Sequence, residues 1–268
     1  NQFHPSVRRI RQRNSSRFAK REYVCFLRFI TDTKELGDAE ARRIAALLKK
    51  KPDALLCLAA GQSAICVYER LIEMYRAGEV DFSKTRIVGL DEWCDYPAYE
   101  GSARWILDTT FFNGINLDRS RMRMFNSNPA DPEKECREIE KYIDDNGKID
   151  YMILGVGMNG HVALNEPGVD LTLGAHVATL ANKTREVSSK YFENGTPVTL
   201  TRGLTLGYKN IFEAKDLVVI LNGAHKAPIV KKFMETPISN EFPVTNIKRS
   251  PIARVVMDQA AASDIYRV

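Results

Sequence analysis

The stretch that decides the fold runs from Asp150 to Gly168 and reads DYMILGVGMNGHVALNEPG. Its apolar start, YMIL, is typical of a buried strand. The strand pattern then breaks into a loop that contains Gly155, Gly157 and Gly160. This spacing formally matches the G-x-G-x-x-G pattern of dinucleotide-binding loops, but Pro167 stands where the following helix would have to continue. The match is weak, so the loop needs another explanation.

The same loop carries Asn159, His161 and Glu166. An imidazole titrates near neutral pH and can move a proton, and a nearby carboxylate can fix its tautomer and raise its basicity. No second histidine or cysteine stands at a spacing that would complete a metal site. The loop therefore indicates an acid–base site, and we expect no bound metal.

Strands and helices alternate along the rest of the chain. The apolar runs ALLCLA (54–59), TRIVGL (85–90) and DLVVIL (216–221) predict strands, and amphipathic stretches between them predict helices. We expect the first helix to begin near Gly37, and a last strand, ARVVMD (253–258), to precede a short C-terminal helix. This alternation predicts an α/β fold, a Rossmann-like open, mostly parallel sheet with helices on both faces.

Composition favours one domain in a reducing compartment. The 268 residues include 44% apolar and 27% charged residues, which is ordinary for a globular protein. Much of the net charge of +5 comes from the stretch VRRIRQRNSSRFAKRE. We expect residues 1–30 to be a basic, poorly ordered extension and residues 31–268 to be a single domain. Five cysteines without a CxxC pair, and no signal peptide or spanning segment, predict a cytoplasmic protein without membrane or nucleic-acid partners.

Three predicted strands end in unusual polar segments, AAGQS (59–63), DEW (91–93) and GVGMNGH (155–161). Ligands of open α/β sheets bind beyond the carboxyl ends of the strands, so these three loops should form one site. In AAGQS, backbone N–H groups at a helix start would attract a phosphate, Gly61 would allow its close approach, and Ser63 could donate a hydrogen bond. An ordinary strand–helix turn is the alternative.

Carboxylates and lysines extend this set. Asp91 and Glu92 directly follow a buried strand, where they must be hydrated, hydrogen-bonded or functional. Asp91 could abstract a carbon-bound proton, although a turn or helix-cap role is the alternative. Lys190 and Lys226 could each bind a phosphate as a point charge, although a single lysine is more often a solvated surface cation.

The segments LDEW, GVGMNGHVALNEPG and HKA, in this order, resemble the glucosamine-6-phosphate deaminase/isomerase family from about residue 37 to the end. Within the family, LDEW, NGHVALNEPG and VTLTRGLTLG (198–207) are closer to the galactosamine-6-phosphate branch. The resemblance implies an open Rossmann-like sheet and conversion of an amino-sugar 6-phosphate to a ketose 6-phosphate and ammonia. It implies no cofactor, and its partner is a small sugar phosphate; assembly into a homo-oligomer is left open.

Position by position, the resemblance also implies roles. Asp91 matches the base that moves a proton between C2 and C1, His161 the group that opens the sugar ring, and Glu166 its carboxylate partner. The residues expected to contact the substrate or its phosphate are Ala60, Gly61, Gln62, Ser63, Glu92, Gly155, Gly157, Lys190 and Lys226.

The chain departs from the glucosamine pattern in three places. Asn159 replaces an aspartate that assists ring opening, and an amide should support an imidazolium less well. Lys190 replaces an arginine and loses bidentate phosphate recognition. The stretch VDLTLGAHVATL (169–180) has no lysine or arginine where bacterial glucosamine enzymes carry a basic allosteric site, so we expect no activation by an acetylated sugar phosphate.

Two other functions fit parts of the pattern. A 6-phosphogluconolactonase-type hydrolase shares a glycine-rich loop with a histidine, but NEPG and DEW favour the deaminase. A non-catalytic sugar-phosphate-binding regulator would not need Asp91, His161 and Glu166, although Asn159 is compatible with it.

Overall fold

The computed structural model describes residues 7–8, 25–188 and 200–265. The strands of the larger sheet are β1 (Val7–Arg8), β2 (Phe26–Ile30), β3 (Leu55–Leu58), β4 (Arg86–Gly89), β6 (Met122–Arg123), β7 (Tyr151–Leu154), β10 (Leu217–Leu221) and β11 (Ala253–Asp258). The α-helices are α1 (Thr33–Lys50), α2 (Ile65–Arg76), α3 (Ala103–Thr110), α4 (Pro132–Asp145), α5 (Asn182–Ser188), α6 (Tyr208–Glu213) and α7 (Ala227–Glu235). Short 3₁₀ helices are η1 (Gln62–Ala64), η2 (Phe112–Gly114), η3 (Arg119–Arg121), η5 (Ala224–Lys226) and η6 (Pro243–Arg249).

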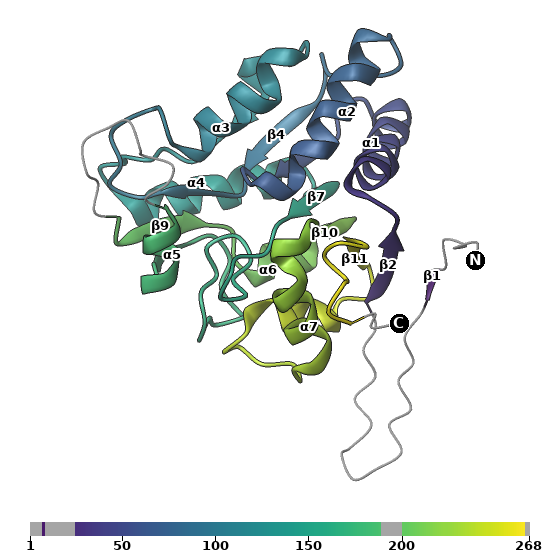
Figure 1. The fold of residues 1–268 in the computed structure, drawn as a ribbon. Coiled ribbons are helices and arrows are strands. Elements are labelled where there is room, and N and C mark those ends of the chain that lie inside the picture. Colours follow the sequence, from purple (N-terminus) through teal and green to yellow (C-terminus); the bar gives the residue numbers. More distant parts are fainter. Residues whose placement is uncertain (1–6, 9–24, 189–199, 266–268) are drawn as a thin grey trace.

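The larger sheet has the order β1-β2-β11-β10-β7-β3-β4-β6, and only β1 and β2 pair antiparallel. Figure 1 shows α1, α2 and α3 on one side of the sheet and α6 and α7 on the other. The predicted α/β fold with a mostly parallel sheet is confirmed. Within the described residues, no helix is both long and apolar enough to cross a membrane.

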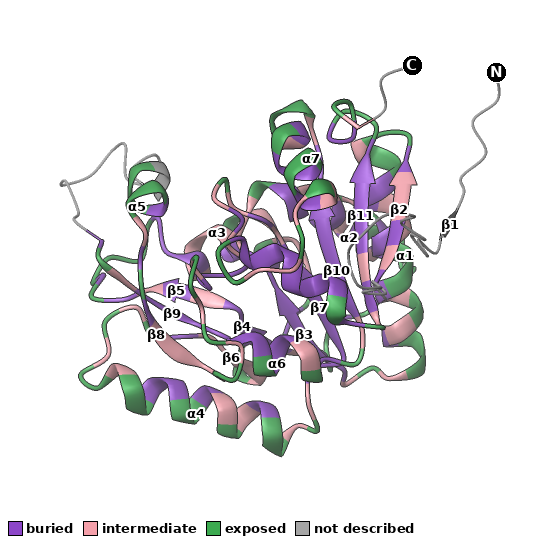
Figure 2. Ribbon diagram, turned by 90° about the horizontal axis from the view of Figure 1, so that it is seen from below, coloured by how far each residue is buried: buried purple, intermediate pink, exposed green. Residues whose placement is uncertain are grey.

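The strand order reverses between β3 and β7. From β3 the chain builds outward through β4 to β6, and it then returns to β7 and builds the other way through β10 to β11. Connections that leave neighbouring strands in opposite directions open a crevice at their carboxyl ends. Because β3, β7 and β10 are buried along their whole length (Figure 2), the floor of this crevice is rigid.

A second, antiparallel sheet was not expected from the sequence. It consists of β5 (Asp91–Trp93), β9 (Arg202–Thr205) and β8 (His176–Thr179), in the order β5-β9-β8. The segment DEW, expected to be a loop, is therefore a strand. It pairs with residues more than a hundred positions further along the chain, a contact that no local pattern encodes.

Both expected ends of the domain differ from the structure. β2 pairs in parallel with β11, so the boundary expected between residues 30 and 31 is wrong and the sheet includes Phe26–Ile30. Residues 1–6 and 9–24 of the expected extension lie outside the described residues. The predicted C-terminal helix is also wrong, because residues 259–265 form turns.

Gly37 lies inside α1 rather than at its start. The helix begins at Thr33, since the Asp32 side chain accepts a hydrogen bond from the Glu35 backbone N–H at 2.8 Å. A Cβ atom on Gly37 would lie 2.4 Å from the carbonyl oxygen of Cys66 in α2. The glycine is therefore the point of close approach between two helices.

We expect Gly37→Ala to lower the free energy of unfolding by about 1–3 kcal/mol, the usual cost of overpacking. Helix propensity alone predicts the opposite sign, since alanine is favoured over glycine by about 1 kcal/mol. Urea unfolding measures the change. The control is Ala46→Gly on the exposed face of the same helix, which should cost about 1 kcal/mol. Stabilisation by Gly37→Ala would contradict the close packing of α1 on α2.

Candidate active site

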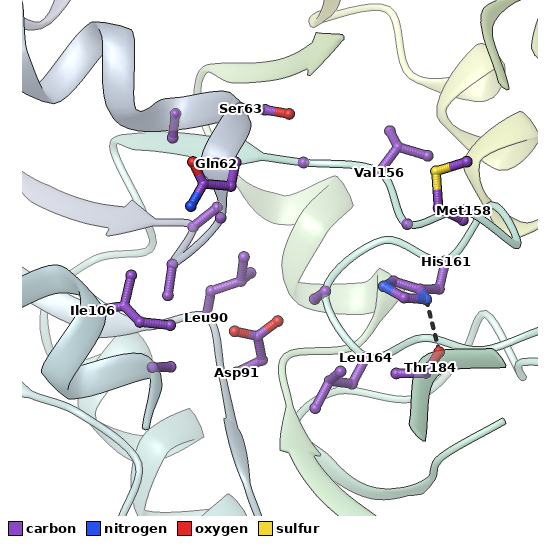
Figure 3. Close-up of a pocket in the computed structure, with 18 of the residues that line it drawn as sticks. Gln62, Ser63, Leu90, Asp91, Ile106, Val156, Met158, His161, Leu164 and Thr184 are labelled. Carbon is purple, nitrogen blue, oxygen red and sulfur yellow. Dashed lines mark hydrogen bonds between the residues drawn. The ribbon is translucent and has the colours of Figure 1, made fainter. Parts of the chain in front are cut away.

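A pocket of about 270 Å³ lies at the carboxyl ends of β3, β4 and β7 (Figure 3). As expected, all three polar segments line it, and the turn after β10 joins them. The predicted site residues that line it are Ala60, Gly61, Gln62, Ser63, Asp91, Glu92, Gly155, Gly157, Asn159, His161 and Lys226. Glu166 contacts His161 from outside the pocket lining, and Lys190 lies outside the described residues.

Asp91 is the first residue of β5, and its carboxylate points into the pocket (Figure 3). The second sheet holds its backbone, since Asp91 pairs with Thr205 of β9. The Leu206 N–H also donates to the carbonyl of the preceding residue, Leu90, at 2.9 Å. Burial raises the pKa of Asp91 to about 7, and the neighbouring charge of Glu92 adds to the shift. A carboxyl group with a pKa near neutrality can both accept and return a proton.

The Glu92 carboxylate is engaged by backbone. It accepts hydrogen bonds from the N–H groups of Trp93 (2.9 Å), Ala103 (2.9 Å) and Arg104 (3.1 Å), the last two in the first turn of α3. Burial raises its pKa to about 7, and these N–H groups oppose the rise. Glu92 thus ties α3 to β5 and supplies charge beside Asp91.

His161 lies across the pocket from Asp91 (Figure 3). Its backbone carbonyl accepts the Gly157 N–H at 2.9 Å, which closes the loop on itself. A Cβ atom on Gly157 would lie 2.2 Å from Cε1 of the imidazole. Gly157 is therefore required for the position of His161, whatever it contributes to a substrate.

Glu166 and Asn159 support this histidine. Glu166 Oε2 is 3.5 Å from His161 Nδ1, and Asn159 Nδ2 donates to the same oxygen at 2.8 Å. The other amide atom, Asn159 Oδ1, accepts the His161 backbone N–H at 3.2 Å. Burial opposes ionisation of Glu166, but hydrogen bonds and the charge of His161 outweigh it and lower its pKa. Asn159 therefore contacts the carboxylate and the backbone, and not the imidazole as its sequence position suggested.

The features predicted to bind a phosphate come together on one side of the pocket. η1 begins at Gln62, directly after Gly61, and continues into α2, which directs backbone N–H groups to the pocket. Lys226 Nζ donates to the Val156 carbonyl at 2.7 Å, so its ammonium lies beside the glycine-rich loop. Asn222 Nδ2 donates to the Ser63 carbonyl at 3.2 Å and joins the two loops. The combination is suited to an anion.

Sequence reasoning missed several pocket residues. Thr184 and Lys183 come from α5, and Thr184 Oγ1 lies 3.1 Å from His161 Nδ1. Trp93 and His225 adjoin predicted residues and could have been included by adjacency. Nothing in the sequence distinguished Thr184 from other threonines. No set of three His, Cys, Asp or Glu side chains within the described ranges is grouped as a metal site.

Comparison with known proteins is consistent with this site. Residues 32–257 match the family model described as glucosamine-6-phosphate isomerases/6-phosphogluconolactonase. A glucosamine-6-phosphate deaminase from Clostridium tetani is 37% identical over 232 residues, 86% of this chain and 96% of the relative. Glucosamine-6-phosphate deaminase 1 of Bacillus subtilis is 34% identical over 230 residues, 85% of this chain and 95% of the relative.

Solved structures extend the comparison. A structure described as a monomeric glucosamine-6-phosphate deaminase superimposes with a TM-score of 0.83 and 32% identity, over 89% of this chain and 99% of the other. A 6-phosphogluconolactonase from Thermotoga maritima has a TM-score of 0.66 at 17% identity, over 87% of this chain and 98% of the other, and shares the fold. The chain belongs to the glucosamine-6-phosphate isomerase/6-phosphogluconolactonase family of enzymes, and the resemblance inferred from the motifs is confirmed.

The raised pKa of Asp91 predicts a pH dependence. A proton acceptor must be ionised, so kcat/KM should fall as the pH drops below about 7. Glu92→Gln removes the neighbouring negative charge and lowers the pKa of Asp91, so this acid limb should move to lower pH by about one unit. Ionisation of the substrate affects the native protein and Glu92→Gln equally, so it does not contribute to the difference between their pH profiles. Glu133→Gln, an exposed change on α4, should leave the limb in place, and an unmoved limb in Glu92→Gln would contradict the coupling.

Proposed function

We propose that the chain deaminates and isomerises a hexosamine 6-phosphate, with glucosamine 6-phosphate converted to fructose 6-phosphate and ammonia. The observation that carries the proposal is the placement of Asp91 and His161 on opposite walls of one pocket, which Lys226 and the start of η1 also line. The curated relatives named glucosamine-6-phosphate deaminase support this substrate.

The mechanism uses this chain's own groups and water. His161 accepts the proton of the anomeric hydroxyl and returns it to the ring oxygen as the bond between C1 and that oxygen breaks, which leaves an open-chain aldehyde. Asp91 removes the C2 proton while the ammonium group on C2 passes a proton to the C1 oxygen, which gives an enolamine. Asp91 then delivers the proton that it holds to C1, and C2 becomes an iminium. Water adds to the resulting C2 iminium, and ammonia leaves to give the ketose. Each acid–base step contributes roughly 10²–10⁴-fold, and the bound phosphate contributes positioning.

Galactosamine 6-phosphate, which would give tagatose 6-phosphate, is the second candidate substrate. It differs from the first only at C4. The segments LDEW and NGHVALNEPG, and Asn159 within the second, favour this branch.

Ammonia detection with a panel of phosphates tests the proposal. The panel contains glucosamine 6-phosphate, galactosamine 6-phosphate and 6-phosphogluconolactone. Ammonia from either amino sugar supports the proposal, and the ratio of the two kcat/KM values assigns the epimer. Lactone hydrolysis without ammonia would make the chain a lactonase, and binding without turnover would make it a regulator.

We further propose that one protomer suffices and that it works in the cytoplasm. One relative is described as a monomeric enzyme, which supports the first part of this proposal. The five cysteines are unpaired, as a reducing compartment requires.

Asp91→Asn should abolish deamination and the exchange of the C2 hydrogen with solvent, with a loss of at least roughly 10²-fold. Substrate binding should persist, because the amide has the same shape as the carboxylate. The melting temperature should not fall, since the change removes a charge whose ionisation burial opposes. The control is Asp95→Asn, the same change at an exposed residue paired with Arg202. Full C2 exchange in Asp91→Asn would refute the assignment.

Lys226→Ala should raise KM by about 10- to 100-fold, because a charge-assisted hydrogen bond contributes about 1.5–3 kcal/mol. The value of kcat should change less, since the phosphate is remote from the reacting carbons. Lys231→Ala removes the same charge from an exposed position on α7 and serves as the control. An unchanged KM would place the phosphate elsewhere.

A further inference from the structure

Thr184 lies beside the proton-moving pair. Its hydroxyl oxygen is 3.1 Å from His161 Nδ1. His161 and Thr184 both lower the pKa of the Glu166 carboxyl group by hydrogen bonding, and His161 contributes more. The direct separation of His161 Nδ1 and Glu166 Oε2 is 3.5 Å, which is long for a hydrogen bond. The hydroxyl is therefore closer to Nδ1 than the carboxylate is, and it can connect the two groups.

Counting protons fixes the direction of this connection. An ionised carboxylate can only accept hydrogen bonds, and a threonine hydroxyl has one proton to donate. If that proton goes to Glu166, Thr184 Oγ1 must accept the proton of His161 Nδ1. If it went to the imidazole instead, Glu166 would face an oxygen lone pair with no proton between them. The first arrangement satisfies all three groups, and it leaves Nε2 of His161 unprotonated.

We propose that Thr184 is a positioning residue for ring opening, which holds His161 in the tautomer protonated at Nδ1 and connects the imidazole to the charge of Glu166. The role in the reaction rests on the proposed function, whereas the tautomer does not. In Figure 3 the ring nitrogen away from Thr184, Nε2, points toward the middle of the pocket. That nitrogen is the one that must arrive unprotonated to accept a proton from the anomeric hydroxyl.

The hydroxyl bridge also serves the charged intermediate. When Nε2 accepts the proton of the anomeric hydroxyl, the imidazole becomes a cation with a proton on each nitrogen. Its Nδ1–H still donates to Thr184 Oγ1, and the Thr184 hydroxyl still donates to Glu166. The negative charge therefore stays on Glu166, beside the cation. The Nε2 proton then passes to the ring oxygen as the C1–oxygen bond breaks, and His161 returns to its starting tautomer.

Asn159 makes this bridge necessary. Its amide N–H₂ donates to Glu166 and its carbonyl accepts the His161 backbone N–H, so neither atom contacts the imidazole. Among the described residues, Thr184 and Glu166 are thus the groups that make polar contacts with His161 Nδ1.

The kinetic test compares Thr184→Val, which keeps the shape but not the hydroxyl, with Thr184→Ser, which keeps the hydroxyl. Thr184→Val should lower kcat for the cyclic amino-sugar phosphate by about 10- to 100-fold, less than loss of an acid–base group itself. It should leave turnover of an analogue lacking the C4 and C5 hydroxyls, which cannot cyclise, within about twofold. Thr184→Ser should restore most of the loss. Thr179→Val, at an exposed position of β8, is the matched control.

The second test measures the tautomer directly by ¹⁵N NMR of the imidazoles, of which the chain has four. The neutral His161 should carry its proton on Nδ1 in the native protein, and Thr184→Val should shift it toward Nε2. A proton on Nε2 in the native protein, or equal slowing of the cyclic and non-cyclising substrates by Thr184→Val, would overturn the proposal. If the native protein released ammonia from neither amino sugar, the proposed function would fail, and the NMR result would still decide the bridge.

Discussion

The site depends on the burial of two adjacent carboxyl groups where the chain leaves the parallel sheet. Burying a carboxylate is unfavourable unless hydrogen bonds or a cation compensate it. Glu92 is compensated by three backbone N–H groups and in return holds the start of α3. For Asp91 no hydrogen bond within the described residues plays this part, and both burial and Glu92 raise its pKa. Asp91 is held in this unfavourable environment by the pairing of its backbone with Thr205 in the second sheet.

The two walls of the pocket shift the pKa values of their carboxyl groups in opposite directions. On one wall, burial brings the pKa of Asp91 near neutrality, where it can exchange a proton with carbon. On the other, hydrogen bonds keep Glu166 ionised despite its burial, where it can stabilise a cationic imidazole. Environments that separate the pKa values of neighbouring acids commonly divide acid–base roles between them. The third carboxyl group, Glu92, raises the pKa of the first while its own oxygens accept backbone N–H groups.

The three polar segments that were expected to meet do line one pocket, and the reason is a general rule for parallel sheets. Strands recognised from short apolar runs must end at one edge, so AAGQS, DEW and the glycine-rich loop were expected to meet before any contact was known. The features that were missed depend on contacts between distant segments. The strand β5 exists through pairing with β9, Thr184 reaches His161 from a separate helix, and Gly37 is explained by a neighbouring backbone. Each belongs to an unremarkable local sequence.

Asn159 shows how one amide can change the way a histidine works. An aspartate in its place would set a second carboxylate against Glu166, whose oxygen is 2.8 Å from Asn159 Nδ2. Two carboxylates at that separation cannot both stay ionised unless a cation or a shared proton lies nearby, and a protonated His161 would supply one. With the amide, Glu166 Oε2 accepts a hydrogen bond from a neutral group, and no second carboxylate competes for the imidazole. The amide thus leaves Glu166 as the anion that faces His161 Nδ1.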